Sequence, residues 1–147
     1  MSAPALPLTE PKQIRFRIMC VPPKTSHHAK KIVRIGKFSR LADKPELVAS
    51  KAMLDSLLMP FQPQAPVSGP VELILTFTWP YRASEPKRNR GRLIYHTSRP
   101  DCSNLAKTLE DRLVALCFLE DDNAVCRLVV AKFWGESPGI EVQITQF

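Results

Sequence analysis

The stretch from Pro100 to Asp122, PDCSNLAKTLEDRLVALCFLEDD, gathers acidic groups, an amide and a lysine around a regular series of leucines. Asp101 or Ser103 has the side-chain oxygen that a helix N-cap requires. The apolar positions that follow have the spacing of one helical face and are Leu105, Leu109, Leu113 and Leu116. The stretch therefore predicts an amphipathic helix that packs its leucines on a core and turns its polar groups away from it.

Strand patterns lie on both sides of this helix. Upstream, residues 13–20 alternate apolar and polar side chains, and residues 71–79 are mostly β-branched or aromatic. Downstream, two segments near 125–134 and 139–146 are joined by a turn that contains Pro138. We expect four strands, with residues 71–79 in the centre of the sheet because apolar side chains occur on both of its faces.

A second helix is expected at about 44–58. Asp43-Lys44-Pro45-Glu46 provides an acidic N-cap, an early proline and a glutamate three residues after the cap. The apolar face of this helix consists of Leu47, Leu54, Leu57 and Leu58. The pattern predicts an α/β or α+β fold, a single domain in which two main helices pack on a mixed β-sheet.

The length and the composition indicate one soluble domain. At 147 residues, the chain is close to the common size of a domain. Residues 1–12 contain three prolines and no periodicity, so we expect a flexible N-terminal arm before a domain at 13–147. No apolar run approaches the roughly 20 residues of a membrane helix. The four cysteines have no zinc-type spacing, and no signal peptide is visible, which predicts a cytoplasmic protein with reduced thiols.

The formal net charge of +7 favours a polyanionic partner. The positive charge is concentrated in residues 24–40, which read as a basic loop or hairpin, and in residues 82–99, which we expect to be mobile until bound. Solvated loops are the alternative for any single residue. The expected contacts to DNA phosphates are Lys24, Lys30, Lys31, Arg34, Lys37, Arg82, Lys87, Arg88, Arg90, Arg92 and Arg99.

Three aromatic residues lie beside or within these basic segments: Phe38, Tyr81 and Tyr95. They either stack on an opened base step or anchor the loops to the core. His27 and His28 are further candidates for phosphate contacts, and nothing supports a metal-binding role for them.

The acidic groups of the first stretch are hard oxygen ligands of the kind that suit Mg²⁺. On an ideal helix, Lys107 and Asp111 lie one turn apart, and Ser103 and Glu110 lie two turns apart on a neighbouring stripe. The alternative is an ordinary solvated helix face, on which Lys107 and Asp111 form a salt bridge worth about 0.2–0.5 kcal/mol.

This spacing resembles that of the RusA family of endodeoxyribonucleases, the Holliday-junction resolvases of phages and prophages. In that family, Asp-x-Asp-Asn-Leu-x-x-Lys leads into a helix and then into Asp-Asp at the head of a strand with a late lysine. The matching residues here are Asp101, Asn104, Leu105, Lys107, Asp111, Leu113, Asp121, Asp122 and Lys132. The resemblance implies a RusA-like fold, a homodimer and a requirement for Mg²⁺ or Mn²⁺.

The resemblance also implies roles for individual residues. Asp101 and Asp122 correspond to catalytic acids that hold the metal, and Lys107 corresponds to the essential lysine. Asp121 is a further metal ligand or a neighbour of the ligands. Asn104 and Asp111 are supporting residues.

Ser103 departs from the family pattern, because it stands where a second carboxylate is usual. A serine coordinates a cation only through a neutral oxygen or through water, so the site loses one formal negative charge. Glu110 is a candidate metal ligand in its place, although it lies seven residues further along the helix, which separates the two backbones by roughly 10 Å. Either Glu110 compensates, or it is a surface glutamate and the nuclease is weakened or inactive.

The sequence thus predicts a metal-dependent, structure-selective DNA endonuclease that resolves four-way junctions by paired phosphodiester cleavage in recombination or repair. We expect a homodimer that acts on branched double-stranded DNA, without a membrane or a small organic cofactor. One alternative is a RusA-like protein that binds branched DNA without cleaving it. The other is a general basic module for nucleic acid, RNA included.

Overall fold

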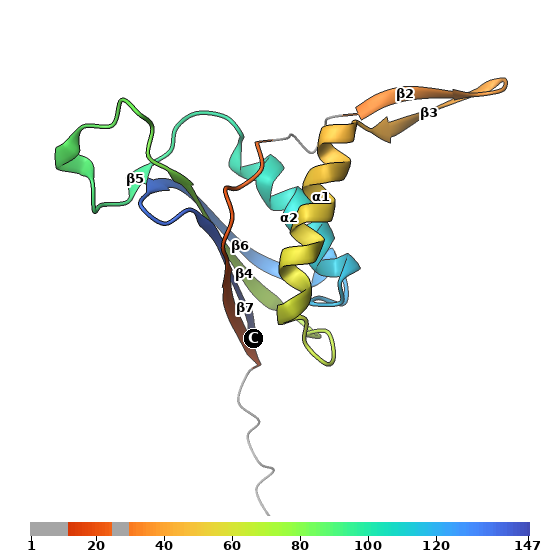
Figure 1. Cartoon of the computed structure of the whole chain (residues 1–147). Coiled ribbons are helices and arrows are strands. Elements are labelled where there is room, and N and C mark those ends of the chain that lie inside the picture. Colours follow the sequence, from red (N-terminus) through yellow and green to blue (C-terminus); the bar gives the residue numbers. More distant parts are fainter. Residues whose placement is uncertain (1–11, 25–29) are drawn as a thin grey trace, which may run out of the picture.

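The computed structural model describes residues 12–24 and 30–147, and the predicted arm therefore lies, except for its last residue, outside the described part. Its centre is a five-stranded sheet with the strand order β1-β7-β4-β6-β5 (Figure 1). The strands are β1 (Gln13–Ile18), β4 (Val71–Pro80), β5 (Ile94–Tyr95), β6 (Val125–Gly135) and β7 (Gly139–Gln146). The sheet is mixed, because β4 and β6 are parallel and the other neighbouring strands are antiparallel.

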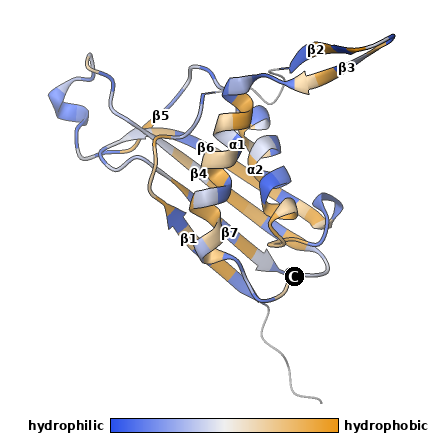
Figure 2. Ribbon diagram, turned by 45° about the vertical axis from the view of Figure 1, so that its right-hand side comes forward, coloured by the Kyte–Doolittle hydropathy of each residue, from blue (hydrophilic) through white to orange (hydrophobic). Residues whose placement is uncertain are grey.

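Two helices, α1 (Pro45–Leu58) and α2 (Cys102–Ala115), cover one face of this sheet (Figure 2). The predicted α+β architecture is confirmed. The leucine stripe of α2 is also confirmed, since Leu105, Leu109 and Leu113 are buried. Leu116 is half-buried and lies just beyond the helix, at its C-cap. Burying a leucine side chain contributes about 1.5–3 kcal/mol, so the stripe determines which face of α2 meets the sheet.

Strand β4 occupies the central position that the sequence predicts, between β7 and β6. Its side chains alternate, and those on the helix-covered side are buried: Leu73, Leu75, Phe77 and Trp79. Thr76 and Thr78 belong to the opposite face by this alternation. The sheet therefore has one face that forms the core with the helices and another on which no helix of the described residues lies.

The predicted N-cap of α1 is wrong. Lys44 is the N-cap residue and makes no side-chain capping hydrogen bond. The Asp43 carboxylate instead accepts hydrogen bonds from Lys30 and from Lys51, whose Nζ lies 2.6 Å from Oδ2. These hydrogen bonds lower the pKa of Asp43 to about 2. Two ammonium groups bind a carboxylate more strongly than backbone amides do, which explains why the side chain leaves the cap position.

Residues 30–43 form a hairpin, which is one of the two alternatives that the sequence leaves open for the basic segment 24–40. Strands β2 (Lys30–Ile35) and β3 (Phe38–Asp43) form an antiparallel two-stranded sheet that projects away from the body (Figure 1). Gly36 has a φ of 61°, a conformation that the tight turn requires and that glycine adopts without strain. His27 and His28 lie outside the described residues.

The basic segment 82–99 is more structured than the expectation of a mobile loop. It contains the short 3₁₀ helix η2 (Lys87–Asn89) and strand β5, which pairs with β6 at the edge of the main sheet. Tyr81 anchors the segment, because its hydroxyl accepts a hydrogen bond from the Arg92 backbone N–H at 3.0 Å. Neither α1 nor α2 combines the length and the apolar character that crossing a bilayer requires, and the same holds for the other helices in the described ranges.

Candidate active site

The candidate site lies where the polar side of α2 meets the turn before β6. Asp101 is the N-cap of α2, and Asp122 begins the short 3₁₀ helix η3 (Asp122–Ala124), which leads directly into β6. The leucine face of α2 is buried on the sheet, so the helix presents its other side to solvent. Asp101 and Ser103 are exposed at the start of the helix, and Asn104 is half-buried.

Lys107 connects the helix to this turn. Its Nζ lies 3.2 Å from Oδ1 of Asp111, one helical turn away, and 3.4 Å from Oδ2 of Asp122. The salt bridge expected from helical spacing is therefore present, together with a second contact that spacing does not predict. The hydrogen bond and the charge of Asp111 raise the pKa of Lys107, and Asp122 adds to this effect. Lys107 is consequently positively charged at neutral pH.

Glu110 belongs to the same charged cluster. Burial raises the pKa of Glu110 most, the positive charge of Lys107 opposes this, and the negative charges of Asp122 and Asp111 raise it further. The charged form of this carboxyl is thus disfavoured by its surroundings. A cation nearby would relieve the repulsion and lower the pKa again.

Asp121 has a structural task in the turn. Its Oδ1 accepts a hydrogen bond from the backbone N–H of Asn123 at 3.0 Å and so caps η3. That hydrogen bond is the first cause of the lowered pKa of Asp121. The side chain thereby stabilises the turn that presents Asp122.

Lys132 supports the other end of the site. Its Nζ donates hydrogen bonds to the backbone carbonyls of Ser98 at 2.5 Å and Pro100 at 2.8 Å. Both carbonyls belong to the segment that leads into Asp101. Lysine side chains on an adjacent strand can hold such a segment because an ammonium group has three donors. Lys132 therefore fixes the backbone from which Asp101 projects.

His96 supports the same segment, and sequence reasoning did not single it out. Its Nδ1 accepts a hydrogen bond from the Ser98 N–H at 3.2 Å, and its ring stacks on Trp134 with centroids 3.9 Å apart. Only 4% of the residue is exposed, and its Nε2 has no hydrogen-bond partner among residues 12–24 and 30–147. Burial and then the charge of Lys132 lower the pKa of His96. A lone histidine in a basic segment has no pattern that would have revealed this position.

The chemistry of these side chains fits a hard divalent cation that keeps most of its waters. Asp122 has 40% of its side chain exposed, Asp101 is exposed, and Glu110 has a raised pKa. Carboxylate oxygens and water are the ligands that Mg²⁺ prefers. Within residues 12–24 and 30–147, no group of three Asp, Glu, His or Cys side chains is arranged to hold a metal. A cation here would depend on few protein ligands.

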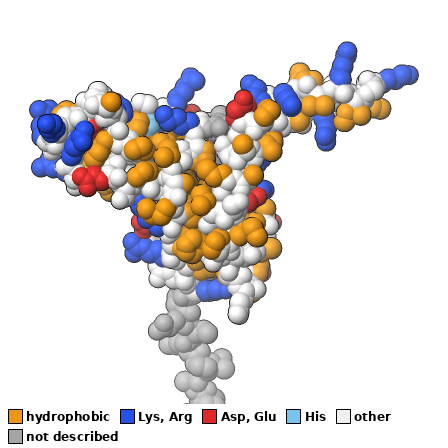
Figure 3. Space-filling model, viewed as in Figure 1, with side chains coloured by type: hydrophobic (Ala, Val, Ile, Leu, Met, Phe, Trp, Pro, Cys, Tyr) orange, Lys and Arg blue, Asp and Glu red, His pale blue; other side chains and the backbone are white. Residues whose placement is uncertain are grey.

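The predicted DNA contacts fall on two surfaces. Figure 3 shows Lys and Arg side chains gathered over the projecting hairpin and over the loop at the opposite end. Lys31, Arg34 and Lys37 are exposed on the hairpin, whereas Lys30 is engaged by Asp43. Lys24, which precedes the hairpin, is exposed. In the segment 82–99, the exposed members are Lys87, Arg88, Arg90, Arg92 and Arg99.

Arg82 differs from the other loop residues. It pairs with the buried Glu85 at 3.2 Å, and its guanidinium lies 5.0 Å from the Trp134 ring centroid. These contacts hold Arg82 against the body of the protein, so it is less available to a phosphate than its neighbours.

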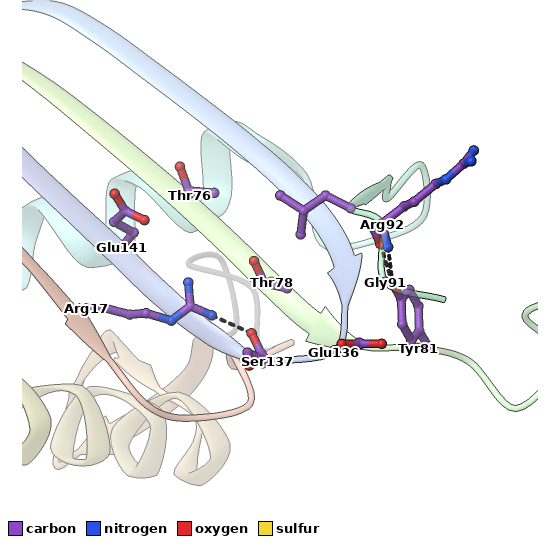
Figure 4. A pocket seen from close by; sticks show the side chains of 10 residues that line it. Arg17, Thr76, Thr78, Tyr81, Gly91, Arg92, Glu136, Ser137 and Glu141 are labelled. Carbon is purple, nitrogen blue, oxygen red and sulfur yellow. Dashed lines mark hydrogen bonds between the residues drawn. The ribbon is translucent and has the colours of Figure 1, made fainter. Parts of the chain in front are cut away.

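A cavity of about 280 Å³ lies elsewhere, on the helix-free face of the sheet (Figure 4). Arg17, Thr76, Thr78 and Glu141 line it from the strands, and Tyr81 and Arg92 line it from the loop. Arg17 donates a hydrogen bond to the Ser137 carbonyl at its rim. None of the α2 acids contributes to this cavity, so it is separate from the candidate site.

Comparison with known proteins identifies related sequences. The family described as Endodeoxyribonuclease RusA matches residues 20–145. The uncharacterized protein YqaN of Bacillus subtilis (strain 168) is 31% identical over 91 residues, covering 58% of this chain and 63% of the relative, slightly less than two thirds of its length. The crossover junction endodeoxyribonuclease rusA of Lactococcus phage r1t is 33% identical over 93 residues, covering 63% of this chain and 69% of the relative.

Proposed function

This chain belongs to the RusA family of endodeoxyribonucleases, and from that premise we propose that it cleaves four-way DNA junctions in the cytoplasm during recombination or repair. The observation that supports the proposal most directly is the contact between Lys107 Nζ and Asp122 Oδ2 at 3.4 Å. It joins a basic and an acidic group that come from a helix and from a separate turn. Such a pair next to exposed acids suits the hydrolysis of a charged phosphodiester.

Asp101 and Asp122 would hold a divalent cation, Mg²⁺ or Mn²⁺, with Asp121 stabilising the turn. Such a cation supplies Lewis acidity and a more acidic bound water. Glu110 takes the place of the carboxylate that Ser103 lacks. The raised pKa of Glu110 supports this role, because a carboxyl that is costly to ionise gains most from a nearby positive charge.

Lys107 acts on the substrate rather than on the fold. Its ammonium group offsets the negative charge that grows on the phosphate oxygens in the transition state. Asp111 and Asp122 keep the side chain in place and protonated. Asn104 orients a neighbouring carboxylate or backbone group.

The basic hairpin and the basic loop bind the arms of the junction. Their lysines and arginines neutralise phosphates and release counterions, so binding weakens steeply as salt is raised. A homodimer places two sites about a two-fold axis, which matches the two-fold outline of a four-way junction. Two sites then cut two strands symmetrically.

A synthetic four-way junction, incubated with and without Mg²⁺ beside a linear duplex, tests the proposal. We expect two symmetric nicks in the junction, only with the metal, and none in the duplex. Asp122→Asn should abolish nicking and retain binding. Glu136→Gln removes an exposed acid in the turn between β6 and β7 and should behave as wild type. If Asp122→Asn nicks at the wild-type rate, the assigned site is wrong.

A second function, binding of branched DNA without cleavage, is favoured by one observation. Ser103 provides a neutral oxygen where the resemblance implies a carboxylate, which weakens the hold on a cation. A stable complex with the junction and no nicks at any Mg²⁺ or Mn²⁺ concentration would support this alternative.

A further inference from the structure

The β2–β3 hairpin exposes four large apolar side chains. Ile32, Ile35, Phe38 and Leu41 are 75%, 57%, 80% and 70% exposed. Figure 3 shows hydrophobic side chains (orange) along the projecting hairpin, with Lys and Arg side chains (blue) beside them. They form two cross-strand pairs, Ile32–Leu41 and Ile35–Phe38, on opposite faces of the hairpin. Exposed apolar groups on a protruding element mark a surface that binds a partner.

The positive charge of the hairpin indicates which kind of partner it binds. Between residues 31 and 42 there are four basic side chains and no acidic one: Lys31, Arg34, Lys37 and Arg40. Asp43 at the base is already engaged by Lys30 and Lys51. A partner surface that is itself positively charged would be repelled by these four basic side chains. A polyanion is the complementary partner.

At the tip of the hairpin, a pair of apolar side chains lies next to basic side chains. Ile35 and Phe38 face each other as the last pair before the turn, and Arg40 lies on the same face two residues after Phe38. Lys37 occupies the turn itself. The Phe38 ring thus lies between Lys37 and Arg40, which would contact phosphates on either side of it.

The base of the hairpin is held firmly. An isolated two-stranded hairpin is marginally stable in water. Here, Lys51 of α1 binds the Asp43 carboxylate at 2.6 Å, and Lys30 binds its other oxygen. This clamp links both strands to the helix, so the tip is presented at a defined distance from the body.

The other two aromatic candidates are less available than Phe38. The Tyr81 hydroxyl is bonded within the basic loop, and the ring is half-buried. Tyr95 is exposed, but its ring packs on Phe133 at a centroid distance of 4.9 Å. Tyr81 therefore anchors the basic loop, Tyr95 forms a ring pair on the surface, and Phe38 is the ring that projects from the body.

We propose that the hairpin tip inserts into the branch point of the DNA, where Phe38 stacks on a base and Ile35 fills the opened step. Arg34, Lys37 and Arg40 hold the flanking phosphates. Apolar side chains of DNA-bending proteins open base steps in this way, and the cost is lowest where stacking is already interrupted. The inference rests on the proposed function and adds where the junction is engaged.

The test uses the full chain and a four-way junction with 2-aminopurine beside the branch point, in Ca²⁺ or EDTA to prevent nicking. Fluorescence should rise on binding, because the base loses its stacking on its neighbours. In Phe38→Ser, we expect the rise to disappear and binding to weaken roughly tenfold, as for loss of one base stack. Tyr95→Ser, another exposed aromatic position, should keep both properties.

The outcomes separate this inference from the proposed function. If Phe38→Ser keeps the fluorescence rise and the affinity, the insertion is refuted, whether or not the protein nicks the junction. If the rise depends on Phe38 but no nicks form with Mg²⁺, the insertion stands and the nuclease proposal falls. If Phe38→Ser converts a dimer to a monomer without DNA, the occupant is a second copy, and the proposal is overturned. Absence of any junction binding by the wild type refutes both.

Discussion

Replacing Lys107 by methionine distinguishes a catalytic lysine from a structural ion pair. The Lys107 side chain is 46% exposed, and its partners Asp111 and Asp122 are 32% and 40% exposed. Ion pairs this accessible to water contribute about 0.2–1 kcal/mol each. We therefore expect Lys107→Met, which removes both pairs, to lower the free energy of unfolding by about 0.4–2 kcal/mol. A domain with a stability of about 5–15 kcal/mol remains folded after such a change.

The expected loss of activity is much larger. Removing one preorganised group that stabilises developing charge lowers a rate about 100-fold to 1,000-fold, equivalent to roughly 3–4 kcal/mol. This exceeds the stability effect of the two exposed ion pairs. A loss of nicking activity much larger than the loss of stability therefore identifies Lys107 as a catalytic residue.

Urea denaturation and single-turnover nicking of a four-way junction at saturating protein measure the two quantities. Lys107→Arg keeps the charge and should retain more activity than Lys107→Met. Arg15→Met is the matched control, because it removes the exposed Arg15–Glu141 ion pair of 2.8 Å from strands far from the acids. Nicking by Lys107→Met within threefold of wild type would refute the catalytic role and leave a surface ion pair.

Three further predictions concern charge at the site. Ser103→Asp should lower the Mg²⁺ concentration for half-maximal nicking, and Glu110→Gln should raise it if Glu110 compensates; a Mg²⁺ titration measures both. Lys132→Met should reduce nicking at least tenfold with unchanged junction binding and accelerate hydrogen exchange of the backbone before Asp101, because two charged hydrogen bonds are lost. Since the folded pKa of His96 is below its ordinary 6.5, the unfolded chain takes up the proton first, and stability should decrease as pH falls through about 6.5. Urea denaturation between about pH 5.5 and 7.5 checks this.

Each of these predictions has a contrary result. An unchanged Mg²⁺ requirement in both Ser103→Asp and Glu110→Gln would show that neither position affects the cation. Lys132→Arg should restore part of the activity, and equal loss in both variants would contradict the hydrogen-bond explanation. His96→Phe preserves a ring on Trp134 and should flatten the pH dependence; an unaltered slope would exclude His96 as its source.

Most elements of this fold could be predicted from local patterns. The leucine spacing of α2 and the alternation in β4 directly reflect the periods of a helix and a strand, so burial of one face follows from the sequence alone. The incorrect N-cap at Asp43 has a different origin. Lys51 competes for that carboxylate from the second turn of α1, and local cap rules do not take such a partner into account.

For the candidate site, the sequence by itself determined the pair Lys107–Asp111, because four residues on a helix are one turn apart. Only the tertiary structure decided that Asp122, 15 residues from Lys107, comes within 3.4 Å of the same ammonium group. It likewise decided that Lys132 reaches the carbonyls before Asp101, 32 and 34 residues away. The physical reason is that backbone geometry sets distances within an element, whereas distances between elements depend on which faces are buried together.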